Sequence, residues 1–195
     1  LMRALRKLLD AGHSLMIIEH NLDVVRAADW IVDLGPEGGE AGGEVVCCGT
    51  PEDIKAHAAS FTGQALREYE RSLGLGEFRV EEGQPLQWLV KAQRAARQVV
   101  DESIRIVNAH EHNLKNLSVD IPRGKFSVIT GVSGSGKSTL AFDILFNEGQ
   151  RRYLESLNAY ARSIVQPAGR PEVDAVYGIP PTVAIEQRLS RGGRK

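Results

Sequence analysis

The chain has 195 residues, 42% of them hydrophobic and 25% charged, and its 24 Lys and Arg residues nearly balance 25 Asp and Glu residues. This composition excludes a disordered chain and fits one large domain or two small ones, while the net charge of −1 gives no global basic field that would announce a nucleic-acid partner. Cys47 and Cys48 are adjacent, so they readily form neither a disulfide with each other nor half of a zinc site, and a reducing, cytoplasmic setting fits best. No apolar run reaches membrane-spanning length, and we expect no membrane partner.

Residues 1–70 alternate helix and strand in the manner of α/β proteins. The pattern predicts, in chain order, an amphipathic helix ended by Gly12, a strand over 14–19, a helix over 22–28, and strands over 30–34 and 44–48. Residues 35–43 are too rich in glycine for regular structure. Thr50 predicts the N-cap of a helix, with Pro51 at the first helical position. Because the chain begins inside a helix, we expect that Leu1 is not a natural start.

Residues 71–102 form the predicted linker, a charged stretch interrupted by glycine and proline. Within it, residues 86–100 are expected to form a helix that carries Lys91, Arg94 and Arg97 on one side. Such a basic face is usually solvated, but contact with nucleic acid or with a protein partner stays open as an alternative.

The last part of the chain, residues 103–195, opens with two short alternating strands, over 103–107 and 117–121, which predict a hairpin or a sheet edge. The elements predicted after them are a buried strand over 125–130, helices over 137–147 and 151–165, and a short strand over 183–187. We expect the second of these helices to pack in the core through one face, which carries Tyr153, Leu157, Tyr160, Ala161 and Ile164.

A phosphate-binding loop, G-x-x-x-x-G-K-[ST], occupies residues 131–138, between a predicted strand and a predicted helix. Its glycines let several backbone N–H groups point inward at a helix N-terminus, where the dipole also favours an anion. Lys137 is expected to reach the β- and γ-phosphates of ATP or GTP, and the Ser138 hydroxyl to bind Mg²⁺. The alternative is a Gly-rich turn without a ligand. The expected nucleotide-binding residues are Gly131, Val132, Ser133, Gly134, Ser135, Gly136, Lys137, Ser138 and Thr139.

Hydrolysis of the nucleotide also needs a carboxylate for Mg²⁺ and a group that positions the attacking water. No apolar stretch that ends in Asp-Glu follows Lys137. His20, however, follows the predicted strand over 14–19, at the edge of an α/β sheet where ligands bind. A functional histidine is one interpretation, and a structural or solvated one is the alternative.

Two long strings lie around His20: Ile-Ile-Glu-His-Asn-Leu-Asp-Val-Val from residue 17, and Ala-Ala-Asp-Trp-Ile-Val-Asp-Leu-Gly-Pro-Glu-Gly-Gly from residue 27. Together with shorter strings at 43–46, 49–52 and 60–63, they closely resemble the tail of an ABC-type ATPase module of the UvrA family. UvrA is the DNA-damage sensor of bacterial nucleotide excision repair, with two ATPase modules per chain. The tail in question is that of the second module.

The last part of the chain resembles the other end of the same family. The strings similar to the head of the first UvrA module are 113–117, the phosphate loop, 142–143, 148–157 and 159–162. The tail of one module thus precedes the head of another, which is not the order of an ordinary UvrA chain. This order indicates a segment across the junction of a tandem fusion of two UvrA-like copies. The resemblance implies an α/β fold of partial P-loop NTPase domains of the ABC type, at 1–70 and 103–195, joined by the linker.

The resemblance also implies roles for individual residues. His20 is expected to be the switch histidine that contacts the γ-phosphate of ATP. Gln187 is expected to be the Q-loop glutamine, which senses Mg²⁺ and the attacking water. Ser138 is expected to bind the same Mg²⁺. The aromatic residue that stacks on adenine in ABC proteins has no clear counterpart, although His110 or His112 could take its place instead of lying in a solvated loop.

Other family motifs do not occur in these residues: the L-S-G-G-type signature helix, the Mg²⁺ aspartate with its catalytic glutamate, and the four-cysteine zinc sites. We therefore expect the chain alone to bind nucleotide weakly and to hydrolyse none. The implied partners of the full-length parent are damaged double-stranded DNA, a UvrB-like repair protein and other ATPase modules by self-association. The alternatives are a free-standing P-loop kinase or transferase and a non-catalytic DNA- or protein-interaction fragment.

Overall fold

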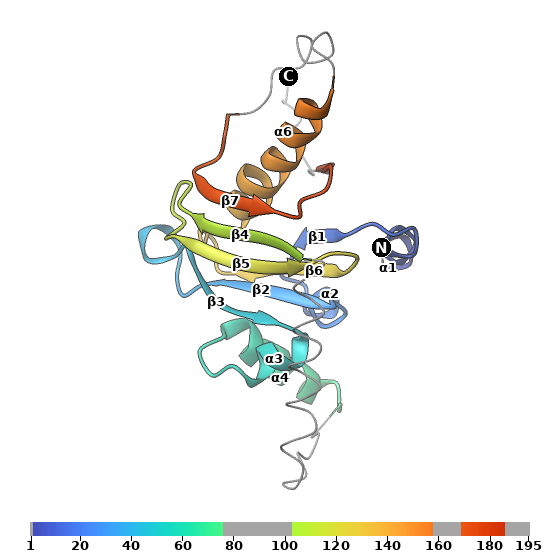
Figure 1. Cartoon of the computed structure of the whole chain (residues 1–195). Helices are drawn as coiled ribbons and strands as arrows, with labels where there is room; N and C mark the ends of the chain where they lie inside the picture. The colour runs from blue at the N-terminus through green and yellow to red at the C-terminus, as the bar shows by residue number, and fades with distance from the viewer. Residues whose placement is uncertain (1, 76–102, 158–168, 186–195) are drawn as a thin grey trace, which may run out of the picture.

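The computed structural model of the chain describes residues 2–75, 103–157 and 169–185, and these form two stacked β-sheets flanked by helices (Figure 1). The larger sheet contains, in spatial order, β1 (Leu15–Ile18), β6 (Phe126–Gly131), β2 (Trp30–Gly35) and β3 (Glu44–Gly49). In this sheet β1, β6 and β2 are parallel, and β3 is antiparallel to β2. The fold is therefore mixed α/β, as the alternation of helix and strand predicted.

The central strand of this sheet comes from the far half of the sequence. Val128 of β6 lies opposite Ile17 of β1 on one side and opposite Ile31 of β2 on the other. Strand β6 is apolar on both faces, and Phe126, Val128 and Ile129 are all almost fully buried. Such a strand is stable only between two neighbours and two covered faces, so the two ends of the chain fold as one unit.

The smaller sheet is antiparallel, with the order β5 (Leu117–Pro122), β4 (Ser103–Ala109) and β7 (Val173–Tyr177). The pairing of β4 with β5 confirms the predicted hairpin. Strand β7 was not predicted, because the prolines and glycines around it conceal a five-residue strand in which only Val176 is fully buried.

Two apolar clusters lie on opposite faces of the larger sheet. One lies between the two sheets, where Val32 and Ile129 pack with Ile106 of β4 and with the helix that follows the phosphate loop. The other lies under the helices α2 (Leu22–Arg26), α3 (Pro51–Ala56) and α4 (Phe61–Ser72), and joins Ile31, Phe126 and Val128 to them. Helix α1 (Met2–Asp10) contributes partly buried leucines to this second cluster.

The start of α3 agrees with the sequence signals, whereas α4 was not predicted. Thr50 forms a capping box with Asp53, in which the Asp53 N–H donates to Thr50 Oγ1 at 3.3 Å and the Thr50 N–H donates to Asp53 Oδ2 at 2.9 Å. Ser60 caps α4 in a similar way, because its Oγ accepts the Gly63 N–H at 2.8 Å.

The region after the phosphate loop differs from its prediction. A π-helix, η2 (Thr139–Phe146), continues without a break into α6 (Asn147–Ser156), so Gly149 lies inside a helix instead of before one. The exposed fraction of Tyr153 is 50%, which makes its predicted place in the core wrong. Helix α6 instead buries Glu148 and Leu154. Burial of the glutamate is possible because two arginines pair with its carboxylate.

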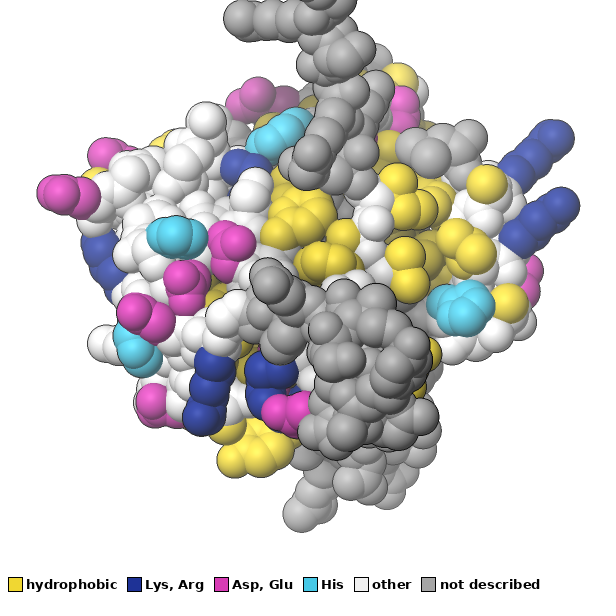
Figure 2. Space-filling view, turned by 90° about the horizontal axis from the view of Figure 1, so that it is seen from above, with side chains coloured by type: hydrophobic (Ala, Val, Ile, Leu, Met, Phe, Trp, Pro, Cys, Tyr) yellow, Lys and Arg dark blue, Asp and Glu magenta, His cyan; other side chains and the backbone are white. Residues whose placement is uncertain are grey.

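The predicted strand near the end of the chain is also not found over residues 183–185, where Val183 and Ile185 are almost fully exposed. The predicted linker helix with its basic side chains, the helical residues beyond 157 and Gln187 lie outside the described residues. No helix in the described ranges is long and apolar enough to cross a membrane. On the face shown in Figure 2, acidic and basic side chains are mixed, and hydrophobic side chains gather near the centre.

Candidate nucleotide-binding site

The phosphate loop leaves the carboxyl end of β6 and closes where η2 begins, at Thr139. Gly131, Gly134 and Gly136 all have positive φ angles, of 127°, 78° and 97°. A Cβ on Gly131 would lie 2.1 Å from the Leu34 carbonyl oxygen, and one on Gly136 would lie 2.6 Å from the Leu114 side chain. The path of the loop therefore requires glycine at these positions.

Lys137 is held inside this loop. Its exposed fraction is 8%, and its Nζ donates to the carbonyl oxygens of Gly131 at 2.9 Å and Val132 at 2.6 Å. Burial lowers the pKa of the ammonium group, an effect that the negative charge of Asp33 opposes. An anion that enters the loop would compete with these two carbonyl oxygens for the ammonium group.

Two hydroxyl groups of the loop are free for a ligand. Ser135 Oγ is buried and has no hydrogen-bond partner among the described residues. Ser138 is exposed and makes no capping hydrogen bond from its side chain. A buried hydroxyl without a partner is costly unless a ligand or water supplies one, so Ser135 fits a site for phosphate. The exposed hydroxyl of Ser138 is open to a metal ion from solvent.

His20 directly follows β1, as predicted, and its backbone is fixed by neighbouring groups. Glu19 Oε2 accepts the N–H of His20 at 2.9 Å and that of Asn21 at 3.1 Å, and these bonds lower the pKa of Glu19. Asn21 in turn caps α2 through Oδ1, which accepts the Asp23 N–H at 3.0 Å. The exposed imidazole of His20 is thus held between the end of a strand and the start of a helix.

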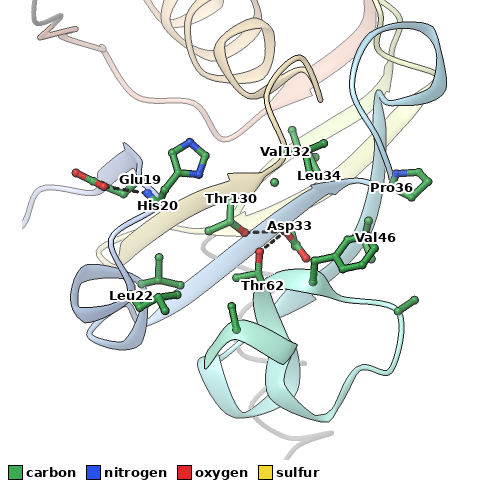
Figure 3. A pocket seen from close by; sticks show the side chains of 15 residues that line it. Glu19, His20, Leu22, Asp33, Leu34, Pro36, Val46, Thr62, Thr130 and Val132 are labelled. Atoms are coloured by element: carbon green, nitrogen blue, oxygen red, sulfur yellow. Dashed lines mark hydrogen bonds between the residues drawn. The ribbon is translucent and has the colours of Figure 1, made fainter. Parts of the chain in front are cut away.

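A cavity of about 280 Å³ lies between His20 and the first two residues of the phosphate loop, Gly131 and Val132 (Figure 3). It lies at the carboxyl ends of the parallel strands, which is the edge where α/β sheets bind ligands. Its polar wall is formed by side chains that come from both halves of the sequence. The residues that line it are Glu19, His20, Leu22, Val25, Asp33, Leu34, Pro36, Val46, Ala59, Phe61, Thr62, Ala65, Thr130, Gly131 and Val132.

Asp33 is the residue of this cavity that the sequence analysis missed. Its exposed fraction is 3%, and its carboxylate accepts hydrogen bonds from Ser60 Oγ at 2.6 Å, Thr62 Oγ1 at 2.8 Å and Thr130 Oγ1 at 2.9 Å. Figure 3 shows Thr62 and Thr130 reaching Asp33 from α4 and β6. The available signal was an acidic residue inside an otherwise apolar strand, which requires buried partners.

The two histidines considered for adenine stacking lie on the connection between β4 and β5. His110 Nδ1 lies 2.9 Å from the Asn108 carbonyl oxygen, and His112 Nε2 lies 3.6 Å from Asp143 Oδ2 at the side of η2. For a metal ion, no group of three or more His, Cys, Asp or Glu side chains suited to binding occurs in the described ranges. Of the two predicted Mg²⁺ ligands, Ser138 lies within the described residues and Gln187 does not.

Comparison with known proteins gives one consistent result. The chain is 37% identical over 192 residues to "UvrABC system protein A" of Chlamydia muridarum, a match that covers 98% of this chain and 10% of that protein. The protein of the same name from Lactiplantibacillus plantarum is 40% identical over 187 residues, with 96% of this chain and 17% of the relative covered. That of Thermus thermophilus is 56% identical over 89 residues, 46% of this chain and 9% of the relative.

Among solved structures, UvrA2 from Deinococcus radiodurans is 53% identical to the chain, with a TM-score of 0.41, over 45% of this chain and 11% of that one. No family model matches the chain. The chain spans 10% of the length of the Chlamydia muridarum relative and 17% of the Lactiplantibacillus plantarum relative.

Proposed function

The chain belongs to the UvrA family, and from this we propose that it is an ATP-binding segment of a UvrA-like protein that recognises damaged double-stranded DNA in nucleotide excision repair. The observation that carries the proposal is the position of β6 between β1 and β2, since it brings the phosphate loop and His20 to one cavity. A free-standing kinase or transferase is not favoured, because the relatives reported above are all UvrA proteins.

Residues 131–139 would hold the phosphates of ATP through backbone N–H groups, with the Lys137 ammonium turning from the Gly131 and Val132 carbonyls to phosphate oxygens. The Ser138 hydroxyl would bind the accompanying Mg²⁺. His20 would donate a hydrogen bond to a γ-phosphate oxygen across the cavity, and Gln187 is proposed to orient water near the metal. Bound ATP supplies the free energy that the full-length protein couples to its work on DNA.

We further propose that the chain spans the junction of two UvrA-like copies. The tail-before-head order of its motifs supports this. The UvrB-like partner, damaged DNA and self-association of ATPase modules are proposed for the full-length protein.

Nucleotide binding is tested by titrating the chain with the fluorescent nucleotide mant-ATP in the presence of Mg²⁺. The expected result is weak but saturable binding that Lys137→Ala reduces by about tenfold or more, since the variant removes the buried ammonium. Absence of saturable binding, or equal binding by the variant, would contradict the proposal. ATP hydrolysis should stay at background. Turnover that Lys137→Ala abolishes would show instead that the parts present here suffice for hydrolysis.

A further inference from the structure

The Gly-rich turn between β2 and β3, residues 36–43, packs directly on the phosphate loop. The Gly39 N–H donates to the Gly134 carbonyl oxygen at 2.9 Å. A Cβ on Gly38 would lie 2.1 Å from the Ser133 carbonyl oxygen. Gly42 also faces the loop, because a Cβ there would lie 3.2 Å from Ser135 Cα, besides 2.3 Å from the carbonyl oxygen of Glu37 in its own turn. Three successive residues of the loop are therefore in contact with the turn.

Asn113, which precedes β5, binds both the phosphate loop and the Gly-rich turn. Its Nδ2 donates to the Gly134 carbonyl oxygen at 2.8 Å and to the Gly39 carbonyl oxygen at 3.2 Å. Both partners are acceptors, which fixes the orientation of the amide with its NH₂ group toward them. The Gly-rich turn is also bonded to the segment that carries Asn113, since the Lys115 N–H donates to the Gly43 carbonyl oxygen at 2.9 Å.

These bonds set the orientation of one peptide group in the phosphate loop. In a trans peptide the C=O and N–H point in opposite directions. The Gly134 carbonyl points outward to Gly39 and Asn113, so the N–H of Ser135 points into the loop, where it donates to the Val132 carbonyl oxygen at 3.2 Å. A phosphate loop binds through inward N–H groups, and this one is held in place from outside.

We propose that Gly38, Gly39, Gly42 and Asn113 form a clamp that positions the phosphate loop for anion binding. They are positioning residues, because they touch the loop and not the phosphate. The proposal rests on the proposed nucleotide site, and it makes phosphate affinity in the second half of the chain depend on a turn from the first half. Displacing the turn should release the Gly134–Ser135 peptide and weaken binding without opening the core.

Gly38 and Glu40 of the same turn give a matched test. Gly38 has φ −102° and ψ 166°, an ordinary conformation, so Gly38→Ala adds only a methyl group that collides with the loop. Glu40 is exposed, and Glu40→Ala shortens its side chain without changing the backbone groups that contact the loop. In mant-ATP titrations of the full chain, Gly38→Ala should weaken binding by about tenfold, since small displacements of a binding group are costly. Glu40→Ala should stay within about threefold of the parent chain, and urea midpoints should show both variants folded.

Asn113 gives an independent series. Asn113→Ala removes both donors and should weaken mant-ATP binding, Asn113→Gln should restore part of the affinity because it keeps the amide, and Asn113→Asp should bind worst because a carboxylate would face two carbonyl oxygens. Lys115→Ala is the control, since that exposed side chain reaches only Glu44 in this region.

The rate of amide hydrogen exchange over residues 131–138 measures, without any nucleotide, how firmly the clamp holds the phosphate loop. Gly38→Ala and Asn113→Ala should speed exchange there and leave β2 and β6 protected. If exchange and affinity in both variants equal those of the parent chain, the clamp is overturned while the nucleotide site stands. If mant-ATP fails to bind the parent chain, the proposed function fails, and unchanged exchange in the variants would still overturn the clamp on its own.

Discussion

Asp33 shows how a single residue connects the two halves of the chain. Its buried carboxylate binds Thr130, the residue before the phosphate loop, and both Ser60 and Thr62 at the start of α4. All three donors are hydroxyl groups, and each would lose its acceptor if the carboxylate were removed. The residue therefore stabilises the wall of the cavity and the entry to the loop together.

Replacement of Asp33 by Asn should be costly, because an amide group offers one acceptor oxygen in place of two and leaves a buried hydroxyl unsatisfied. We expect a loss of about 1–3 kcal/mol in the free energy of unfolding, measured by urea denaturation. Asp120→Asn is the matched control, since Asp120 pairs with Arg105 on the surface and should matter by less than about 1 kcal/mol. Equal losses in the two variants would contradict the buried-network interpretation.

Glu148 makes stability depend on pH. Its exposed fraction is 4%, and although burial raises the pKa of its carboxyl group, hydrogen bonds from Arg151 and Arg152 outweigh that effect and bring the pKa below the ordinary 4.5. A carboxyl group with a lowered pKa in the folded state stabilises the fold above its unfolded pKa and loses that contribution as pH falls through the folded value.

The free energy of unfolding should therefore fall as pH drops below about 4.5, and Glu148→Gln should flatten that part of the profile. Urea denaturation from pH 7 to pH 3 measures it. Glu155→Gln is the control, because that carboxylate is exposed and binds only the outer side of Arg151. A profile that Glu148→Gln leaves unchanged would show that the ion pairs do not favour the folded state.

At the residue scale, the motif predicted the loop residues because their spacing is fixed by local chain geometry, and His20 was singled out by its place after a predicted strand. Asp33 and Glu148 could not be assigned in the same way. The partners of Asp33 lie on other elements, whereas Arg151 and Arg152 follow Glu148 on the same helix. An acidic residue in a strand or helix is usually solvated, so neither carboxylate was expected to be buried. Only the packing of α4 on β2, and of β7 on α6, makes these carboxylates internal.

Secondary-structure elements were predicted best where capping and punctuation are local. Thr50, Pro51 and Asp53 predicted the start of α3, and Thr50→Ala should lower the free energy of unfolding by about 0.5–2 kcal/mol through loss of the capping box. Gln64→Ala, on the exposed side of α4, should change it by less than about 0.5 kcal/mol. Urea midpoints for the pair test this, and a neutral Thr50→Ala would mean that the cap is replaced by water.

Elements whose identity depends on a distant partner were predicted poorly. Strand β7 is short and lies between prolines and glycines, and it forms because β4 offers it an edge. The π-helix at Thr139–Phe146 follows the phosphate loop, and its wider turns leave no periodic signal that distinguishes them from an α-helix in sequence. The exposed path at Val183 and Ile185 likewise contradicts an alternating pattern that looked like a strand.

At the scale of the molecule, the sequence suggested two partial modules in series, and the structure places β6 of the second segment between two strands of the first. Pairing over about a hundred residues is not encoded in local pattern, so it could not be predicted from spacing alone. The arrangement is what brings the phosphate loop, His20 and Asp33 to one cavity.

It follows that residues 103–195 expressed alone should lack a cooperative unfolding transition, because Phe126 and Val128 would lose the strands and helices that cover them. Adding residues 1–102 in trans should restore the transition and suppress binding of the dye ANS to exposed apolar surface. A cooperative transition in the isolated second segment would contradict the idea that the two segments form one core.

The most direct measurement of the composite site is crosslinking with an ATP analogue that carries a photoreactive group on its γ-phosphate, followed by mass spectrometry of the labelled peptides. If the cavity joins both segments, labels should appear on residues 131–139 and also on residues 19–22, and Lys137→Ala should remove both sets. Labelling confined to the phosphate loop, or labelling that persists in the Lys137→Ala variant, would contradict a nucleotide site shared by the two ends of the chain.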